Sequence, residues 1–116
     1  MLQVEIKVDK KKLEADGKYS WEDFDEAVKY AYLQHDCLAC QKSSETEYLF
    51  YGKGTNNDFS CLWLANLYLT EEEWFMKYAL HFVWNDTDVN EPEDLILAVK
   101  EEKAGIYAWD KNNIKL

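Results

Sequence analysis

The stretch Leu2-Gln3-Val4-Glu5-Ile6-Lys7-Val8 alternates apolar and polar side chains from its first residue to its last. Successive side chains of a β-strand point to opposite faces, so one set of this stretch faces a core and the other faces water. The stretch therefore predicts a half-buried strand. The elements that follow it are interpreted as its packing partners.

A strong helix is predicted over residues 20–35, after a charged segment at 9–16 that holds one helical turn and ends at Asp16-Gly17. Ser20 is a suitable N-cap and Asp23 follows three residues later, as in a short capping box. Apolar side chains recur at steps of three and four, the spacing of one helix face. Asp25 and Lys29 are spaced to pair on the outer face. The apolar face consists of Trp21, Phe24, Ala27, Val28, Ala31 and Tyr32.

A β-hairpin is predicted next, with strands at 37–42 and 46–52 and a turn at 43–45. A helical stretch over 57–77 follows, with its N-cap among residues 56–58 and a bend near Leu69. Thr70 and Glu73 have the spacing of a capping box, which starts a second helical piece there.

Residues 78–84 predict a further strand because they are aromatic and β-branched, with Tyr78, Leu80, Phe82 and Trp84 on one face. Pro92 and Glu93 mark the start of another helix, which has Gly105 as its C-cap. A last short strand is expected at 106–109. The first six elements read β-α-β-β-α-β, which predicts an α+β ferredoxin-like sandwich with an extra C-terminal helix.

Composition and charge limit the function. The chain has 116 residues, is 47% hydrophobic and has 31% charged residues, so a single domain over 1–116 is expected. Its net charge is −10, and all 13 basic residues are lysines. Binding to nucleic acid is disfavoured, because neutralising phosphates supplies most of that affinity and arginine supplies the forked contacts to guanine.

No segment is apolar over the ~18 residues that a membrane span needs, so no membrane contact is expected. The N-terminus lacks the charged and apolar regions of a signal peptide. Three cysteines are an odd number, and a chain of this size needs no disulfide to fold. Reduced thiols and a cytoplasmic location are therefore predicted.

The cysteines raise two chemical hypotheses. His35, Cys37 and Cys40, with the distant Cys61, offer four soft ligands of the kind that bind zinc. Cys61 stands alone, however, and on a strand Cys37 and Cys40 point to opposite faces. Cys37 and Cys40 also have the spacing of a redox pair, but the preceding helix ends just before them, so its dipole has the wrong sign to lower a thiol pKa. Buried structural cysteines are the simpler interpretation, and no metal or other cofactor is predicted.

Two loops resemble ligand sites in part. Asp86, Asp88 and Asn90 match the first three ligand positions of a calcium loop, but the required glycine is Glu91 and the bidentate glutamate is Leu97. The Gly52–Thr55 segment precedes a helix N-terminus, where free amides bind anions, but it lacks the Walker order. Helix capping explains the first loop, and a turn that needs a positive φ explains the second.

Catalytic motifs are sparse. The chain has two histidines, His35 and His81, and no Gly-x-Ser-x-Gly elbow. A hidden enzyme would use His81 as its base, with Cys61 as a possible neighbour in space. We expect that the protein is not an enzyme.

Acidic residues gather in two stretches. Residues 13–28 carry a net charge of −5 and residues 71–99 carry −7, whereas residues 1–12 carry +2. An acidic surface steers basic partners, and the chain's many tryptophans and tyrosines are favoured contact residues, although a dense aromatic core has the same composition. The predicted partner-binding residues are Glu71, Glu72, Asp86, Asp88, Glu91 and Asp94.

Several short segments resemble small proteins of Firmicute phages and mobile elements. These are residues 4–9, 16–19, 51–54 and 58–59, together with Trp74-Phe75. The resemblance covers most of the chain and carries over no functional residue. It implies a cytoplasmic accessory protein, and small acidic proteins of this setting often inhibit host defence or serve as immunity partners of toxins.

These observations together predict a non-enzymatic acidic module that binds protein. It would act as an inhibitor or adaptor on a basic partner, one form of which is an anti-defence protein that occupies a nucleic-acid groove. The alternatives are a small-ligand or metal-binding domain, using the region of Cys37 and Cys40 or the Gly52–Gly54 turn, and a toxin-immunity protein.

Overall fold

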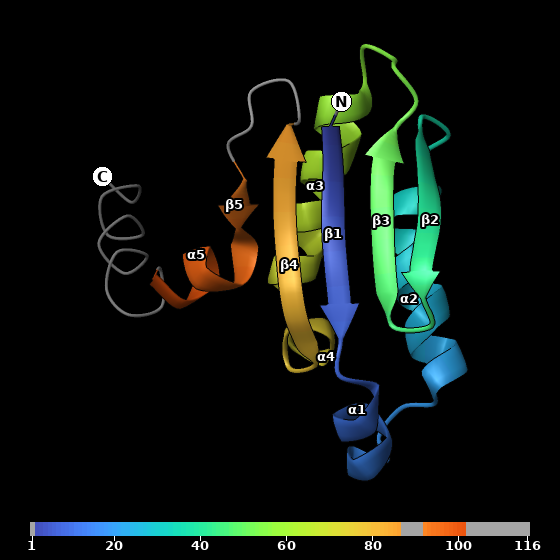
Figure 1. Cartoon of the computed structure of the whole chain (residues 1–116), viewed down its shortest axis with the longest axis vertical. Helices are drawn as coiled ribbons and strands as arrows, with labels where there is room; N and C mark the ends of the chain where they lie inside the picture. The colour runs from blue at the N-terminus through green and yellow to red at the C-terminus, as the bar shows by residue number, and fades with distance from the viewer. Residues whose placement is uncertain (1, 87–91, 102–116) are drawn as a thin grey trace.

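The computed structural model describes residues 2–86 and 92–101. Its strands form one antiparallel sheet in the order β2-β3-β1-β4-β5, and helices α2 and α3 lie against one face of that sheet (Figure 1). The strands are β1 (Leu2–Val8), β2 (Leu38–Ser44), β3 (Glu47–Gly52), β4 (Ala79–Asp86) and β5 (Glu93–Asp94). The helices are α1 (Lys10–Asp16), α2 (Trp21–Leu33), α3 (Asp58–Thr70), α4 (Glu73–Met76) and α5 (Leu95–Glu101).

The first strand is confirmed and lies at the centre of the sheet. Val4, Ile6 and Val8 are buried, while Glu5 and Lys7 are exposed on the other face. In the register, Val4 lies between Phe50 and Trp84, and Ile6 lies between Tyr48 and Phe82. The alternating sequence of β1 therefore sets which side chains of its two neighbours enter the core.

Helix α2 is also confirmed. The Ser20 hydroxyl accepts a hydrogen bond from the Asp23 amide at 3.1 Å, as an N-cap does. The helix before it, α1, is longer than the single turn that was predicted, with 7 residues. It begins after the N-cap Asp9 and ends before Gly17, whose φ is +65°. A left-handed residue at this place favours glycine and closes the helix.

The predicted hairpin is present, with its turn at residues 45–46, one to two residues later than predicted. The long helical stretch divides into α3 and α4, but the capping box is wrong. Thr70 is the last residue of α3, and its hydroxyl donates to the Leu67 carbonyl at 2.8 Å. Leu80 was predicted to share one face with Tyr78, Phe82 and Trp84, but Leu80 is 64% exposed while Tyr78 and Phe82 are buried. The register between β1 and β4 shifts here, because Lys7 pairs with His81 and Val8 with Ala79, so Leu80 falls at an irregularity that breaks the alternation.

The C-terminal part differs most from the prediction. The helix expected to begin at Pro92-Glu93 begins at Leu95, because Glu93 and Asp94 add a short strand to the edge of β4. Helix α5 contacts β4 and α3, so it extends the helical layer. The predicted C-cap Gly105 and the strand at 106–109 lie outside the described residues. The α+β class is confirmed, with a five-stranded antiparallel sheet, while the ferredoxin-like classification stays a prediction.

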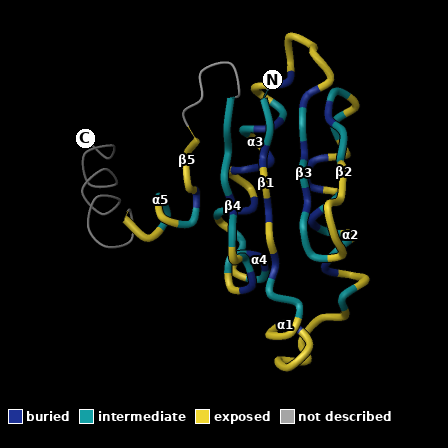
Figure 2. Tube along the Cα trace, in the orientation of Figure 1, coloured by how far each residue is buried: buried dark blue, intermediate teal, exposed yellow. Residues whose placement is uncertain are grey.

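The core is densely aromatic. Phe24 on α2 packs against Trp74, Phe75 and Tyr78, with ring centroids 5.6–6.3 Å apart. Figure 2 shows the buried residues along the inner strands and the helices behind them. Much of the aromatic content therefore belongs to the core. The fully buried rings are those of Tyr32, Tyr48, Tyr78, Phe50, Phe75 and Phe82.

No helix among the described residues is long and apolar enough to cross a membrane.

Candidate functional site

Helix α3 has an apolar outer surface. Its sequence from Asp58 to Thr70 contains no charged residue after Asp58, and large side chains project on every side of it. Leu62 is fully buried beneath the helix, but Leu64 is 58% exposed and Leu67 is 42% exposed. A helix that is apolar all round is expected inside a core, not at a surface. This helix therefore has a face that the described fold does not cover.

Helix α2 contacts α3 and also carries exposed apolar side chains. Asp25 and Lys29 lie on the flank of α2 that reaches Lys42 of the hairpin. The helical repeat places Tyr30, 67% exposed, on the outer side toward α3. We call this surface the α2–α3 outer face. It consists of Tyr30, Leu33, Leu64, Leu67 and Tyr68, all of which are exposed.

Acidic residues lie on the same two helices and directly after α3. Exposed acids on α2 are Glu22, Asp23 and Glu26, and α3 is followed by Glu71 and Glu72. Two of the six predicted contact residues, Glu71 and Glu72, therefore lie beside the apolar surface. Glu22 and Glu26 follow the helical spacing of Tyr30 and Leu33, so the outer side of α2 carries both acidic and apolar side chains.

The other predicted contact residues lie elsewhere. Asp86 is the last of the 8 residues of β4, at the opposite end of this strand from α4 and the preceding Glu71 and Glu72. Asp94 caps α5, because its carboxylate accepts hydrogen bonds from the amides of Ile96 and Leu97 at 3.0 and 3.1 Å. Asp88, Asn90 and Glu91 fall outside the described residues. The four described acids, Glu71, Glu72, Asp86 and Asp94, thus do not form one patch, and Asp94 has the helix-capping role expected for this loop.

The amides of the Gly52–Thr55 turn bind a carboxylate of the same chain, that of Asp58. The Asp58 carboxylate accepts hydrogen bonds from the amides of Gly54 and Thr55, at 2.7 and 3.1 Å, and from the Thr55 hydroxyl at 2.6 Å. Burial raises the pKa of Asp58, but these hydrogen bonds lower it by more, so the carboxyl ionises more readily than usual. The amides of Gly54 and Thr55, which the sequence analysis weighed as an anion site, are therefore already bonded to Asp58. The positive φ predicted for the turn is found at Gly54, whose φ is +95°.

Two of the cysteines meet in one pocket. Cys37, just before β2, and Cys61, in the second turn of α3, line a pocket of about 480 Å³ together with His35 and Asn57. The Cys37 side chain acts on Cys61 and, with burial as a second cause, raises the pKa of Cys61 to about 11. Both side chains are partly exposed. The sequence analysis weighed Cys37 and Cys40 as a redox pair, but the cysteine that shares a pocket with Cys37 is Cys61.

Cys40 lies apart from that pocket, near Asp25, Lys29 and Lys42. Burial raises its pKa. Within residues 2–86 and 92–101, no group of three or more His, Cys, Asp and Glu side chains is arranged to hold a metal ion. The four soft ligands considered for zinc therefore do not converge.

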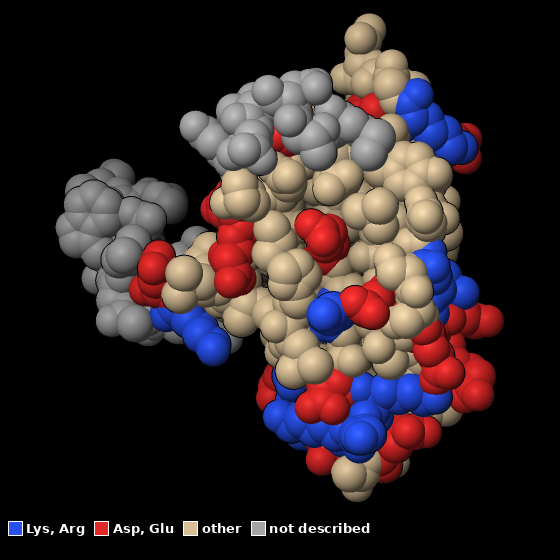
Figure 3. All heavy atoms as spheres, viewed as in Figure 1, with Lys and Arg blue, Asp and Glu red and all other residues tan. Residues whose placement is uncertain are grey.

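No helix of the described residues covers the other face of the sheet, which Figure 3 shows from the front. Lys7 pairs with Glu47 at 3.4 Å, and His81 lies across from Lys7 on β4. These side chains border a depression of about 330 Å³. Cys61 lies in the helical layer on the other side of the sheet. The hypothesis that His81 and Cys61 meet in space is therefore wrong.

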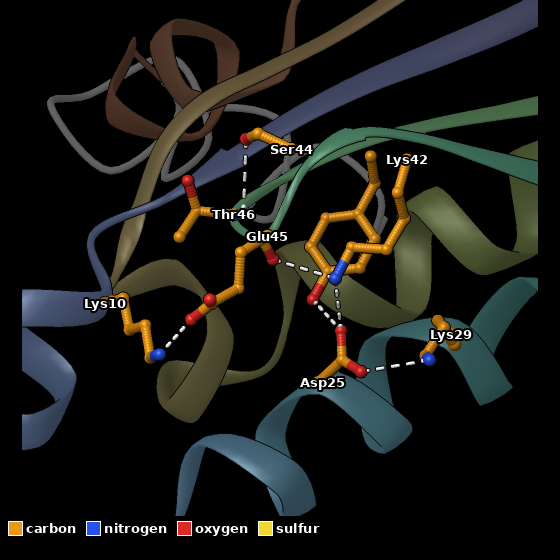
Figure 4. A network of polar contacts seen from close by, with 8 residues as sticks. Lys10, Asp25, Lys29, Lys42, Ser44, Glu45 and Thr46 are labelled. Carbon is orange, nitrogen blue, oxygen red and sulfur yellow. Dashed lines mark hydrogen bonds and ion pairs between the residues drawn. The ribbon is translucent and has the colours of Figure 1, made fainter.

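Lysines gather at the end of the molecule where α1 and the β2–β3 turn meet (Figure 4). Asp25 accepts from Lys29 at 2.9 Å and from Lys42 at 3.0 Å, and it also accepts from the Tyr48 hydroxyl. Lys10 pairs with Glu45 of the turn. These contacts fasten the hairpin to α2 and α1. The charges of Lys10, Lys29 and Lys42 are therefore paired with acids of the same chain.

No protein-family model, no curated protein and no solved structure matches this chain.

Two of these features were missed in the sequence. The apolar outer face was visible as the uncharged run from Phe59 to Leu69, which was interpreted only as a helix. The contact of Cys37 with Cys61 had no local signal, because it depends on how closely α3 approaches the β2–β3 edge.

Proposed function

We propose that the protein is a non-enzymatic protein-binding module whose contact surface is the α2–α3 outer face. The observation that carries this proposal is the exposure of Leu64 and Leu67 on a helix with no charge after Asp58. Contiguous exposed apolar side chains rimmed by polar ones mark contact sites more often than ordinary surface. Tyr30 and Tyr68, 67% and 48% exposed, supply the aromatic anchors that such sites favour.

The partner that fits this face is a basic protein with an apolar centre to its own contact surface. The chain carries a net charge of −10, and acidic residues lie on α2 and in the segment after α3. Opposite charges raise the association rate and fix the orientation of docking. A second copy of the chain fits less well, because it would bring Glu22, Glu26 and their counterparts together. The module would act as an inhibitor or adaptor by occupying that partner.

The fold is proposed to follow the ferredoxin-like plan in its first four strands. The order β2-β3-β1-β4 supports this, because β1 pairs with β3 and β4 and not with β2. Helices α1 and α4 and strand β5 are then additions to that plan. We also propose a cytoplasmic location, since all three cysteines are free.

The test compares two kinds of exposed leucine. One variant carries Leu64→Ser and Leu67→Ser on the outer face, and the control carries Leu80→Ser on β4, where the leucine is 64% exposed away from that face. Exposed substitutions of this kind change stability by about 0.5 kcal/mol or less, so both variants should fold. The probe is a synthetic amphipathic helix with leucines on one face and lysines on the other.

Calorimetric titration should show that the outer-face variant binds this peptide about 10-fold or more weakly than the wild type, because each lost anchor costs about 1 kcal/mol or more. The Leu80→Ser control should bind like the wild type. Glu71→Lys with Glu72→Lys should weaken binding at low salt and flatten its salt dependence. Equal peptide binding by all variants contradicts the proposal. A dimer of the free protein that Leu64→Ser and Leu67→Ser dissolve would instead assign the face to a second copy.

A further inference from the structure

The pocket that contains Cys37 and Cys61 has a structure that explains why the two thiols meet. Strand β2 begins opposite the end of β3: Leu38 pairs with Gly52, and the Cys37 carbonyl accepts a hydrogen bond from the Lys53 amide at 2.9 Å. The position of Cys37 at the edge of the sheet is therefore fixed by its own backbone hydrogen bond and by the strand pairing of the next residue, Leu38.

Helix α3 approaches this edge unusually closely. A Cβ on Gly52 would lie 2.2 Å from the Asp58 carboxylate, so no side chain fits at residue 52. The first turn of α3 can press against the strand only because Gly52 has no side chain. Cys61 follows Asp58 by three residues, on the next turn of the helix. The same close approach that seats Asp58 thus brings Cys61 to Cys37.

Cys37 and Cys61 are both partly exposed, so a small disulfide can reach their thiols. Both line a pocket of about 480 Å³, which His35, Asp36, Thr55 and Asn57 also border. The neighbouring Cys37 side chain and, second, burial raise the pKa of Cys61 to about 11, which reduces its thiolate fraction. Because the thiolate is the attacking form of a cysteine, we assign the first attack to Cys37 and the second to Cys61.

We propose that Cys37 and Cys61 are a dithiol that low-molecular-weight disulfides oxidise to a reversible intramolecular disulfide. The bond fastens the N-terminal part of α3 to the start of β2. This proposal rests on the pocket and not on the partner-binding face, so it stands or falls separately from the proposed function. Cytoplasmic disulfides are usually transient and redox-sensing, and a partly exposed pair of this kind fits that role.

The chemistry takes two exchange steps with a disulfide RSSR. The Cys37 thiol loses its proton to water and its sulfur attacks RSSR; a Cys37–SR bond forms, the RS–SR bond breaks and RS⁻ leaves with the electron pair. The Cys61 thiol then loses its proton and attacks the Cys37 sulfur, which forms the Cys37–Cys61 bond and expels a second RS⁻. The pair loses two electrons and two protons, and RSSR becomes two RSH.

The test uses the folded full chain and oxidised glutathione as the probe. After incubation, remaining thiols are blocked by alkylation, and the peptides are mapped by mass spectrometry. The expected product has lost two hydrogens, links Cys37 to Cys61 and carries the alkyl group on Cys40. Excess dithiothreitol should restore three free thiols. The bond closes a loop of roughly 25 residues, so the oxidised protein should melt about 10 °C higher than the reduced one.

Three variants separate this pair from nonspecific oxidation. Cys40→Ser should form the same bond at the wild-type rate, because Cys40 lies outside the pocket. Cys61→Ser should stop at a glutathione adduct on Cys37, since the resolving thiol is missing. Cys37→Ser should leave Cys61 unmodified for much longer. A bond that includes Cys40, a stable glutathione adduct on the folded wild type, or three thiols that stay free in the folded wild type would each overturn the proposal.

Discussion

Helices α2 and α3 have the same length, 13 residues each, and cover the same sheet, but their outer surfaces differ. Helix α2 is capped by the Ser20 side chain and carries four acids and a lysine on its exposed and flanking positions. Helix α3 lacks a side-chain cap at Asn57 and carries apolar residues outside as well as inside. Most of the exposed positions of α2 are charged, with Tyr30 and Leu33 as exceptions, whereas the exposed positions of α3 are mainly apolar. The proposed contact surface rests on this difference.

The largest test of this comparison contrasts two leucines on α3. Leu62 is fully buried, and its replacement by alanine should cost about 2 to 5 kcal/mol of unfolding free energy through lost burial and a cavity. Leu64 is 58% exposed, so the same replacement should cost about 0.5 kcal/mol or less. Urea unfolding of both variants measures the contrast.

A large loss of stability at Leu64 would mean that another part of the chain covers it. In that case the outer face is not available to a partner. The companion variant Leu67→Ala, at 42% exposure, should behave like Leu64→Ala and provides the internal control.

The local features of α2 and β1 were predictable because their signals lie within a few residues. The alternation of Leu2 to Val8 fixes a strand, and Ser20 with Asp23 fixes the start of a helix. The apolar outside of α3 was also present in the sequence, as a run with no charged residue. The class of the fold followed from these elements alone.

Features that depend on contacts between distant segments could not be read in advance. The approach of Asp58 to Gly52 joins α3 to β3, and only this contact places Cys61 at Cys37. Strand β5 consists of Glu93 and Asp94, which have low strand propensity and pair because β4 offers a free edge. Glu71, Glu72 and Asp86 belong to one acidic stretch of the sequence, but Glu71 and Glu72 lie near the beginning of β4 and Asp86 lies at its end. Sequence distance gives no measure of these separations.

The next effect concerns the buried contact that joins the two helices. The Tyr32 hydroxyl on α2 donates to the Asn66 side-chain oxygen on α3 at 2.6 Å, and both residues are buried. Tyr32→Phe leaves that oxygen buried without its donor, which should cost about 1 to 3 kcal/mol. Unfolding of the variant in urea measures the cost.

A double variant sharpens this result. Tyr32→Phe with Asn66→Leu replaces both polar partners by apolar groups, and stability should return to within about 1 kcal/mol of the wild type. Within the described residues the Asn66 amide nitrogen has no hydrogen-bond partner, which adds to the expected gain. If the double variant were less stable than Tyr32→Phe alone, the polar contact would be holding the helices in register by more than its own hydrogen bond.

A pH-dependent effect is expected on the flank of α2. Burial raises the pKa of Asp25, but hydrogen bonds from Tyr48, Lys29 and Lys42 lower it by more, so its pKa lies below the ordinary 3.8. A lowered pKa contributes stability that is present above the unfolded-state pKa and is lost as the pH falls through the folded-state value. Asp25→Asn should cost about 1.5 kcal/mol at pH 7, because hydrogen bonds to a charged group are lost.

The difference between Asp25→Asn and the wild type should shrink as the pH falls below about 4. Unfolding curves at pH 7 and at pH 3 measure this change. Helix α3 offers the matched control, since Asn57→Ala removes no ionisable group and its effect should be the same at both pH values. A constant cost for Asp25→Asn across this range would show that the carboxylate charge contributes nothing.

The smallest effect separates the N-termini of the two helices. Ser20 accepts a hydrogen bond from the Asp23 amide, so Ser20→Ala should cost about 1 kcal/mol. The Asn57 side chain makes no cap hydrogen bond. The Asp58 carboxylate instead accepts hydrogen bonds from the amides of Gly54 and Thr55, which hold the beginning of α3 against the preceding turn. Asn57→Ala should therefore cost a few tenths of a kcal/mol. Thermal unfolding of the two variants in parallel resolves the difference, and equal costs would mean that both helices depend on their cap residue alike.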